Sequence, residues 1–348
     1  MALPRHILVF RFSALGDIAM CVPVLKNLLN QYPALQITFV SIPFVQPMFE
    51  GIDRLSFIGV NIKAEYNGIA GLYRLSKKIK RTLSFDAVAD LHDVLRTKVL
   101  RKFLGRPTAV IDKGRKERKE LTRQHHKNLH PIQTVFKRYA DVFEKLGYTI
   151  TLDIKEGYSK LQPDISLLQN HKDGIINIGI APFAKHQAKM YPLDKMEGVV
   201  EILLKNTQIN LYIFSASNEC ESISHWFDKS ERIFRVSGKY NFKQELNLIS
   251  QLSLMITMDS ANMHLASLYD VPVVSVWGGT HPFLGFYGWG QPYDYIIQSD
   301  LPCRPSSVFG NKNCPVHGAA GCMQLIRPNM ICEKTIEILQ QKGKLHAC

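Results

Sequence analysis

The sequence predicts an α/β protein made of two Rossmann-like halves, each built around a parallel sheet. Short β-branched runs alternate with helical patterns along almost the whole chain, which is typical of parallel sheets. The 348 residues exceed what one hydrophobic core usually fills. A polar stretch over 155–174, which contains Pro163, separates two such series. We therefore expect domains over 1–160 and 170–328, and a final segment, 329–348, whose helix packs back toward the N-terminal domain.

The first series starts at the N-terminus, where the apolar run is too short for a signal peptide and instead indicates a strand. Strands are expected at Ile7–Phe10, Gln36–Val40, Leu55–Val60, Ala87–Leu91 and Ala109–Ile111. Helices are expected at Ile18–Gln31, Leu72–Leu83, Val94–Leu104 and Ile132–Leu146. Gly147 follows the last helix, and glycine at that place is a common stop signal.

The second series has the same alternation. Strands are expected at Ile175–Ile180, Ile209–Phe214, Arg232–Val236, Leu254–Thr257 and Val273–Trp277. Helices are expected at Leu193–Lys205, Glu219–Phe227, Phe242–Gln251, Ala261–Leu268 and Asn329–Gln341. Residues 278–325 are rich in Gly, Pro and Cys, so we expect them to be mostly irregular.

Positive charge is concentrated in one segment, 72–138. It holds 19 Lys or Arg against six Asp or Glu, an excess of 13 that equals the net charge of the whole chain. One interpretation is a solvated helical face, and the other is a surface for a polyanion such as nucleic acid, an anionic bilayer or a phosphorylated glycolipid. The segment has no nucleic-acid motif and no aromatic residues interleaved for base stacking. The acceptor-binding candidates of this segment are Arg96, Lys113, Arg115 and Lys116.

The cysteines point to a reducing compartment. Seven cysteines, an odd number, without a signal peptide argue against a disulfide framework, and no window is long and apolar enough to span a membrane. We expect a cytoplasmic protein. Cys303, Cys314, His317 and Cys322 form a C-x10-C-x2-H-x4-C pattern that could bind structural zinc. The spacing is unusual, so we favour free structural cysteines and expect no metal in the functional site.

The most informative stretch is Leu254–Pro282, where polar side chains follow two probable parallel strands. Asp259 and Ser260 come directly after the first strand, and His264 lies one turn into the next helix. Ligands of open α/β sheets bind at the carboxyl ends of strands, and the start of a helix binds anions. The alternative is structural, with Asp or Ser capping the helix and His264 partly buried on it.

Each half has one further candidate residue after its first strand, Asp17 in the first half and Lys189 in the second. Asp17 ends the segment Arg11–Asp17 and directly precedes an expected helix. This segment lacks the G-x-G-x-x-G spacing, so a dinucleotide fingerprint is not supported. A helix N-cap is the interpretation that the local sequence favours, and a general base is the functional alternative. Lys189 follows the strand Ile175–Ile180 and is either a phosphate-binding lysine or an ordinary surface lysine.

In their order along the chain, these segments resemble glycosyltransferase family 9, the ADP-heptose:lipopolysaccharide heptosyltransferases. The matching pieces are ILVFRFSALGDIAMCVPVLKNL, KMYPLDKMEGVVEIL, DSANMHLASLYDVPVVSVWGGTHP and the stretch that ends in CMQLIRP. The resemblance implies a GT-B fold, with two Rossmann-like domains facing a central cleft, the donor in the C-terminal domain and the acceptor in the N-terminal domain. It also implies an inverting, metal-independent transfer from a nucleotide sugar, with no cofactor and with heptose and ADP as the first candidates.

The resemblance assigns roles to individual residues. By this resemblance, Asp17 occupies the position of the family's base, which deprotonates the acceptor hydroxyl. Donor binding is implied for Lys189, Asp259, Ser260, Ala261 and His264, and more weakly for Glu219. The implied partners are a nucleotide sugar and a phosphorylated lipopolysaccharide-core glycolipid, with peripheral contact to the anionic inner face of the cytoplasmic membrane and no nucleic acid.

Three positions depart from the family pattern. Ala261 stands where the family usually has glycine, Tyr191 where it has tryptophan, and Ala184-Lys185 where the loop is rich in hydroxyl groups. The methyl group of Ala261 restricts close approach of a donor, because glycine lacks that atom. This motivates an alternative, a catalytically impaired protein that binds a nucleotide sugar or glycolipid. A nucleic-acid-binding protein is a further alternative, motivated by charge alone.

Overall fold

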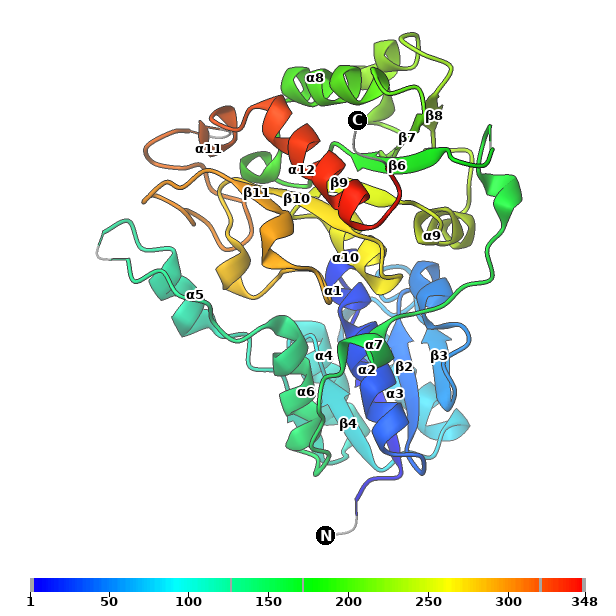
Figure 1. Ribbon diagram of the computed structural model, residues 1–348. Coiled ribbons are helices and arrows are strands. Elements are labelled where there is room, and N and C mark those ends of the chain that lie inside the picture. Colours follow the sequence, from blue (N-terminus) through cyan, green and yellow to red (C-terminus); the bar gives the residue numbers. More distant parts are fainter. Residues whose placement is uncertain (1–2, 126, 171, 319–320, 346–348) are drawn as a thin grey trace. The chain divides into compact units, whose positions relative to one another are not determined.

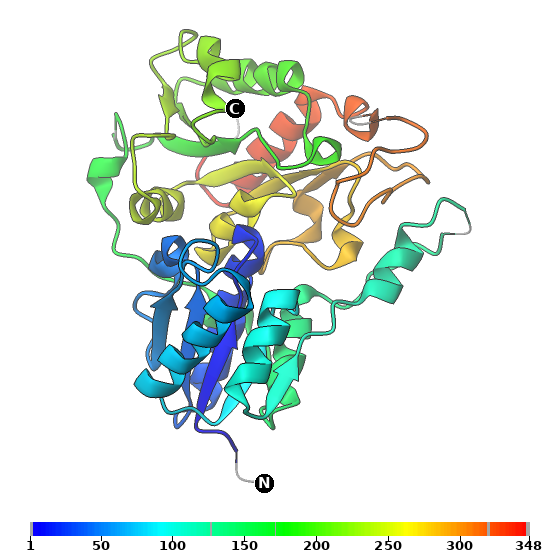
Figure 2. The same cartoon turned by 180° about the vertical axis from the view of Figure 1, so that it is seen from behind.

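The computed structural model describes residues 3–125, 127–170, 172–318 and 321–345 (Figure 1). The chain divides into two compact units. Unit 1 contains Met1–Lys113 and Gln133–Tyr158, and unit 2 contains Gly114–Ile132 and Ser159–Cys348. Each unit has one all-parallel sheet with helices on both faces (Figures 1 and 2). The predicted α/β class with two Rossmann-like sheets is confirmed.

The sheet of unit 1 has the strand order β3-β2-β1-β4-β5. Its strands are β1 (His6–Phe10), β2 (Gln36–Ser41), β3 (Leu55–Gly59), β4 (Ala87–Asp90) and β5 (Thr108–Val110). Its helices are α1 (Leu15–Ala19), α2 (Cys21–Gln31), α3 (Gly68–Thr82), α4 (Leu95–Leu104), α6 (Val135–Glu144) and α7 (Ile154–Gly157). Leu8 and Phe10 of β1 pack with Leu75 and Ile79 of α3 and Leu100 of α4, so alternate residues of a strand build the core on that face.

The sheet of unit 2 has the order β11-β10-β9-β6-β7-β8. Its strands are β6 (Ile176–Ala181), β7 (Ile209–Ile213), β8 (Ile233–Arg235), β9 (Leu254–Met258), β10 (Val273–Trp277) and β11 (Ile296–Gln298). Its helices are α5 (Arg115–Leu121), α8 (Leu193–Leu204), α9 (Phe242–Ser250), α10 (Ala261–Leu268), α11 (Gly321–Gln324) and α12 (Pro328–Gln341). Apolar residues of β6 pack with those of α8 and α12 in one core.

Both strand orders contain a switch point, where successive connections leave in opposite directions along the sheet. In unit 1 the chain moves from β1 to β2 and β3, and then crosses to β4 and β5 on the other side of β1. In unit 2 it moves from β6 to β7 and β8, and then crosses to β9, β10 and β11. The loops after β1 and β4, and after β6 and β9, therefore diverge and leave room for a ligand at the strand ends.

Several elements differ from the sequence prediction. The helix expected over Ile18–Gln31 is two helices, α1 and α2, and the helix expected over Glu219–Phe227 is a 3-10 helix, Cys220–Trp226. Strand β11 and helices α5 and α7 were not predicted. Each of these three is short, with seven residues or fewer, so periodicity could not reveal it.

The domain assignment differs in two details. The segment Gly114–Ile132 belongs to unit 2 although it interrupts unit 1 in the sequence. Helix α12 contacts α8, β9 and β10 of unit 2, whereas we expected it to pack toward the N-terminal domain. Its apolar residues, among them Ile331 and Leu339, join the core of unit 2, and this burial fixes its place.

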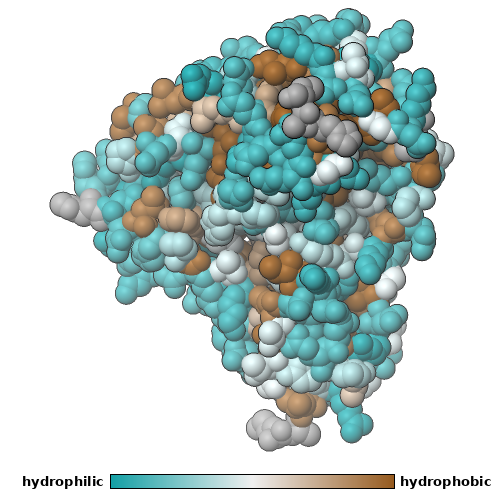
Figure 3. Space-filling view, in the orientation of Figure 1, coloured by the Kyte–Doolittle hydropathy of each residue, from teal (hydrophilic) through white to brown (hydrophobic). Residues whose placement is uncertain are grey.

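The described part of the chain has no helix that is long and apolar enough to cross a bilayer. The face in Figure 3 is mostly hydrophilic, with apolar residues in small separate patches.

Candidate active site

Unit 1 places Asp17 beside the switch point, on the loop and short helix that follow β1. Asp17 is the third residue of α1, and its Oδ2 atom accepts the backbone N–H of Ala14 at 3.2 Å. The N-cap position itself belongs to Ala14. The predicted alternative, that Asp17 is the N-cap, is therefore wrong in position, although the carboxylate does bind a backbone N–H at the start of the helix.

Asp17 also forms an ion pair with Arg11, the first residue after β1. Nη2 of Arg11 lies 2.6 Å from Oδ2 of Asp17, and Nη1 donates to the carbonyl of Leu91 at 2.6 Å. The Arg11 side chain is 9% exposed and the Asp17 side chain is 27% exposed. Arg11 is thus fixed inside the protein, and the carboxylate is the more accessible member of the pair. Both contacts that the described residues make with this carboxylate use Oδ2, so Oδ1 is available to accept a proton from a substrate.

His92, on the loop after β4, supports the same segment from the other side of the switch point. Its Nδ1 accepts the backbone N–H of Phe12 at 3.4 Å, which places the ring proton on Nε2, 3.3 Å from the hydroxyl of Ser13. Burial, together with the positive charges of Arg11 and Lys113, lowers the pKa of His92 to about 3. The imidazole is therefore neutral at pH 7 and orients the loop between β1 and α1.

In unit 2 the switch point carries a second ion pair, between Lys189 and Asp259. Lys189 ends a 3-10 helix, Gln187–Lys189, after β6, and Asp259 follows β9. Their Nζ and Oδ2 atoms are 2.7 Å apart. Here the side chain of the carboxylate is 6% exposed and that of the cation is 16% exposed. An ammonium group has three donors, so Lys189 can bind an anion while it keeps this contact with Asp259.

The start of α10 lies directly after Asp259. Ser260 occupies the N-cap position, but its hydroxyl lies 2.9 Å from that of Thr257 and makes no capping hydrogen bond to the described helix. Ala261 is the first helical residue and His264 is buried one turn later. Backbone N–H groups at this helix start therefore remain available for an anion beside Lys189.

The two glycines after β10 bring the Lys189 loop close to the sheet. The N–H of Gly279 donates to the carbonyl of Ala188 at 2.8 Å, next to Lys189. A Cβ atom on Gly279 would lie 2.9 Å from the Cβ of Ala188, and one on Gly278 would lie 2.9 Å from its carbonyl oxygen. Side chains at these positions would push the loop away, so both glycines hold Lys189 in place.

Tyr191 has a structural role. It is fully buried, and its hydroxyl donates to the carbonyl of Ile326 at 2.9 Å, between the Lys189 loop and the start of α12. Glu219 lies after β7 and is half-buried, and its carboxylate accepts the N–H of Ala216 at 2.7 Å. Neither side chain contacts the Lys189–Asp259 pair among the described interactions.

The four basic candidates fall into two groups. Arg96 is exposed at the start of α4, and Lys113 is half-buried and donates to the carbonyl of Asp93 at 3.1 Å, both in unit 1. Arg115 and Lys116 are exposed on α5, which belongs to unit 2. Acceptor binding by these four residues stays a prediction, since two of them belong to unit 1 and two to unit 2.

The rest of the basic segment is partly used for packing. Arg118 of α5 donates to the carbonyl of Leu284 at 3.3 Å and lies 4.1 Å from the ring centre of Phe286. Lys127 donates to the carbonyls of Cys303 and Pro305. Its neighbour His126 lies outside the described residues. These contacts explain why the segment belongs to unit 2.

Sequence reasoning missed Arg11 and His92 as parts of the site. His92 follows β4 as Asp259 follows β9, so the rule that drew attention to Asp259 could have found it. Arg11 directly follows β1 and meets the same rule, but its pairing with Asp17 could not be predicted, because that contact depends on the turn between β1 and α1.

The two sheets define a doubly wound fold with an ion pair at each switch point, and comparison with known proteins gives the class. The family model described as glycosyltransferase family 9 (heptosyltransferase) matches residues 72–317. The chain is therefore a glycosyltransferase, and it belongs to glycosyltransferase family 9.

Relatives cover most of the chain at low identity. It is 20% identical over 297 residues to the lipopolysaccharide core heptosyltransferase OpsX of Haemophilus influenzae, covering 80% of each chain. A family 9 glycosyltransferase structure from Veillonella parvula superposes with a TM-score of 0.78 at 18% identity, covering 97% of this chain and 98% of that one. E. coli heptosyltransferase WaaC, solved with ADP-2-deoxy-2-fluoro heptose, gives a TM-score of 0.66 at 16% identity over 95% and 99%. The GT-B fold expected from the resemblance is thus confirmed.

Proposed function

We propose that this glycosyltransferase moves a sugar, with heptose as the first candidate, from an ADP-linked donor to the lipopolysaccharide core or a related phosphorylated glycolipid. The names of its relatives support this substrate class, since they are heptosyltransferases of lipopolysaccharide and lipooligosaccharide. The geometry of the two ion pairs supports the roles of the residues.

Unit 2 is the donor half in this proposal. Lys189 and the N–H groups at the start of α10 bind the diphosphate, and Asp259 holds the ammonium group of Lys189 in place. The same groups stabilise the negative charge that develops on the leaving diphosphate oxygen. This fixed positive charge replaces the divalent cation that many nucleotide-sugar enzymes use, so transfer needs no metal in the reacting site.

Unit 1 supplies the base. The acceptor hydroxyl oxygen attacks the anomeric carbon, its proton passes to Oδ1 of Asp17, and the bond from the anomeric carbon to the diphosphate oxygen breaks. A single displacement of this kind inverts the anomeric configuration. Arg11 keeps the carboxylate oriented, and neutral His92 holds the loop that carries Ser13 and Ala14.

The basic residues hold the acceptor. Arg96, Lys113, Arg115 and Lys116 interact with its phosphate groups, and the exposed charge on α5 adds attraction to an anionic bilayer. The protein then works at the inner face of the cytoplasmic membrane without crossing it.

One observation carries this proposal: both units place an ion pair at the switch point of a parallel sheet, with a carboxylate more exposed in unit 1 and a cation more exposed in unit 2. The test incubates the protein with ADP-, GDP- and UDP-sugars and a lipopolysaccharide-core acceptor, and detects the product by mass spectrometry. Transfer from an ADP-heptose to the acceptor supports the proposal. Binding of a nucleotide sugar without turnover would instead identify the impaired binding protein, and failure to bind any donor would reject the donor assignment.

A further inference from the structure

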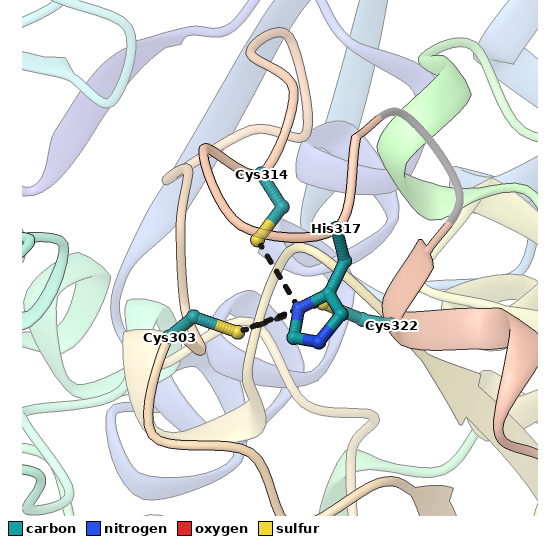
Figure 4. A group of neighbouring side chains, drawn as sticks. All are labelled: Cys303, Cys314, His317 and Cys322. Atoms are coloured by element: carbon teal, nitrogen blue, oxygen red, sulfur yellow. Dashed lines mark hydrogen bonds between the residues drawn. The ribbon is translucent and has the colours of Figure 1, made fainter.

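Three cysteines and one histidine that the transfer reaction does not use converge in unit 2. Cys303, Cys314, His317 and Cys322 place one ligand atom each within 4.8 Å of all the others. Figure 4 shows the three sulfur atoms and the imidazole directed toward a common centre. Cys314 and His317 come from one tight turn, closed by two backbone hydrogen bonds between Cys314 and Gly318. The cysteine-and-histidine pattern of the sequence therefore becomes a compact cluster.

Three of the six separations in this cluster are close to those of a tetrahedral metal site. Zinc–sulfur and zinc–nitrogen bonds imply ligand separations of about 3.8 Å between two sulfurs and about 3.6 Å between sulfur and nitrogen. Nδ1 of His317 lies 3.5 Å from Sγ of Cys303 and 3.8 Å from Sγ of Cys314, and the Sγ atoms of Cys303 and Cys322 are 4.0 Å apart. The last distance is about twice that of a disulfide, so the two sulfurs are not bonded to each other.

The geometry points to a site for one tetrahedral transition-metal ion held by Cys303, Cys314, His317 and Cys322. Three thiolates and one imidazole are a ligand set of structural zinc, and iron is the other ion that thiolate-rich tetrahedral sites accept. On binding, the three thiols lose their protons to solvent and neutral His317 coordinates through Nδ1. All four positions are filled by the protein, so the ion is structural.

The ion would fasten the loop that packs against the Lys189 segment. Arg304, next to Cys303, is 2% exposed and donates to the carbonyls of Gly278 and Thr280 at 2.5 and 3.0 Å. The N–H groups of Ser306 and Ser307 donate to the carbonyl of Gly279 at 2.9 and 3.1 Å. The loop that begins at Cys303 is therefore hydrogen-bonded to Gly278 and Gly279, the two glycines that position Lys189.

A close contact continues the connection to Lys189 itself. Gly310 has φ +75°, and a Cβ atom there would lie 2.6 Å from Cγ of Lys189. The loop between Cys303 and Cys314 thus packs directly on the stem of this lysine. We expect the ion to keep the loop and Lys189 in position, and so to support donor binding. The effect on donor binding rests on the proposed function, whereas the metal site itself does not.

The first test uses elemental mass spectrometry to measure the metal content of the whole chain, purified anaerobically without chelators. One metal ion per chain is expected, and the measured contents of zinc and of iron tell which ion it is. Cys303→Ser and Cys314→Ser should lose the ion, whereas Cys220→Ser, which changes another buried cysteine of unit 2, should keep it. Less than a tenth of an ion per chain, with no uptake when zinc or cobalt is added, would overturn the proposal. A Cys303–Cys322 disulfide found by peptide mapping would overturn it as well.

The second test uses His317, whose exposure makes its variants easy for the fold to accept. His317→Ala should weaken cobalt binding by about tenfold or more, because metal affinity depends on the complete ligand set. His317→Cys should restore tight binding with stronger thiolate-to-cobalt absorption. Equal cobalt affinity and identical spectra in all three proteins would exclude His317 as a ligand.

The third test separates this site from the transfer function. Removing the ion should raise amide hydrogen exchange in 303–318 while exchange in the strands of unit 1 stays unchanged. This readout needs neither donor nor acceptor, so it can succeed even if the proposed substrate is wrong. Unchanged exchange in 303–318 after complete removal of the ion would contradict the structural role.

Discussion

The switch points of the two units carry the same kind of ion pair with opposite exposure. In unit 1 the cation Arg11 is 9% exposed and the carboxylate Asp17 is 27% exposed. In unit 2 the carboxylate Asp259 is 6% exposed and the cation Lys189 is 16% exposed. Each pair therefore buries the member that orients the other, and presents to a ligand the charge that its proposed role requires.

In each pair one residue positions the other: Arg11 and Asp259 are the buried positioning residues, and Asp17 and Lys189 are the residues proposed to act on the substrates. A base must expose an oxygen to the acceptor hydroxyl, and a diphosphate site must expose a positive charge. In both units the buried partner prevents the reacting side chain from rotating away, which favours a site arranged before the substrate binds. We therefore expect the two exposed members, Asp17 and Lys189, to control different steps of the reaction.

Asp17→Asn should have the largest effect on turnover. The amide keeps the shape of the side chain but cannot accept the proton of the acceptor hydroxyl, so kcat should fall by about 10²- to 10⁴-fold. The rate of sugar transfer with a nucleotide-sugar donor and a lipopolysaccharide-core acceptor measures this.

Asp53→Asn is the matched control, because Asp53 is an exposed carboxylate of unit 1 outside the switch point. It should leave kcat within about twofold, as expected for an exposed side chain away from the reacting groups. An Asp17→Asn enzyme that kept the wild-type kcat would remove Asp17 from the role of base.

Lys189→Ala should affect the donor step instead. Losing charge-assisted contacts to a diphosphate, worth about 1.5–3 kcal/mol, should raise the donor KM by roughly 10- to 150-fold. Lys185→Ala, an exposed lysine of the same loop, is the control and should change little. Equal donor KM values for the two variants would show that the exposed cation of unit 2 does not bind the diphosphate.

Most of the fold could be predicted from the sequence. Strand β10 and helix α10 have the predicted bounds, because each is a strongly patterned run with clear ends. The pairing of Lys189 with Asp259 could not be predicted, since the order of β6 and β9 in the sheet is a property of the tertiary fold. The approach of Cys303 to Cys322 likewise depends on a loop without periodicity, so spacing alone made the cluster look weak.

The basic surface of α5 should matter less than either ion pair. Replacing Arg115 and Lys116 with serine should weaken binding to vesicles that contain an anionic lipid by about 1 kcal/mol per charge, roughly 30-fold in total at low salt. Lys205→Ser, an exposed lysine after α8, serves as the control. The same affinity for the double variant and the wild type in a vesicle sedimentation assay would contradict a membrane role for α5.

A smaller effect concerns pH and the loop of unit 1. Burial lowers the pKa of His92 to about 3, so below about pH 6.5 the unfolded chain binds a proton that the native imidazole does not. The stability of unit 1 should therefore be full above pH 6.5 and fall progressively as the pH falls toward 3. Replacing His92 with glutamine should reduce this loss, seen as a Tm drop between pH 7 and pH 4.5 that is smaller by roughly a few degrees.

His281 provides the matched comparison in unit 2. Burial and the charges of Arg304 and Lys127 lower its pKa to about 4, so its contribution has the same sign. Replacing His281 with glutamine should therefore reduce the acid sensitivity of unit 2. If neither replacement changed the pH dependence of Tm, the neutral state of the two buried histidines would not contribute to stability.

In the proposed reaction, the exposed carboxylate of unit 1 and the exposed cation of unit 2 serve different substrates, and this division of roles can be measured directly. Titration calorimetry with ADP, without acceptor, tests it on the wild type and the Asp17→Asn and Lys189→Ala variants. We expect an unchanged Kd for Asp17→Asn and a Kd at least about tenfold weaker for Lys189→Ala, as loss of a charge-assisted hydrogen bond requires. Weaker ADP binding by Asp17→Asn together with unchanged binding by Lys189→Ala would contradict it.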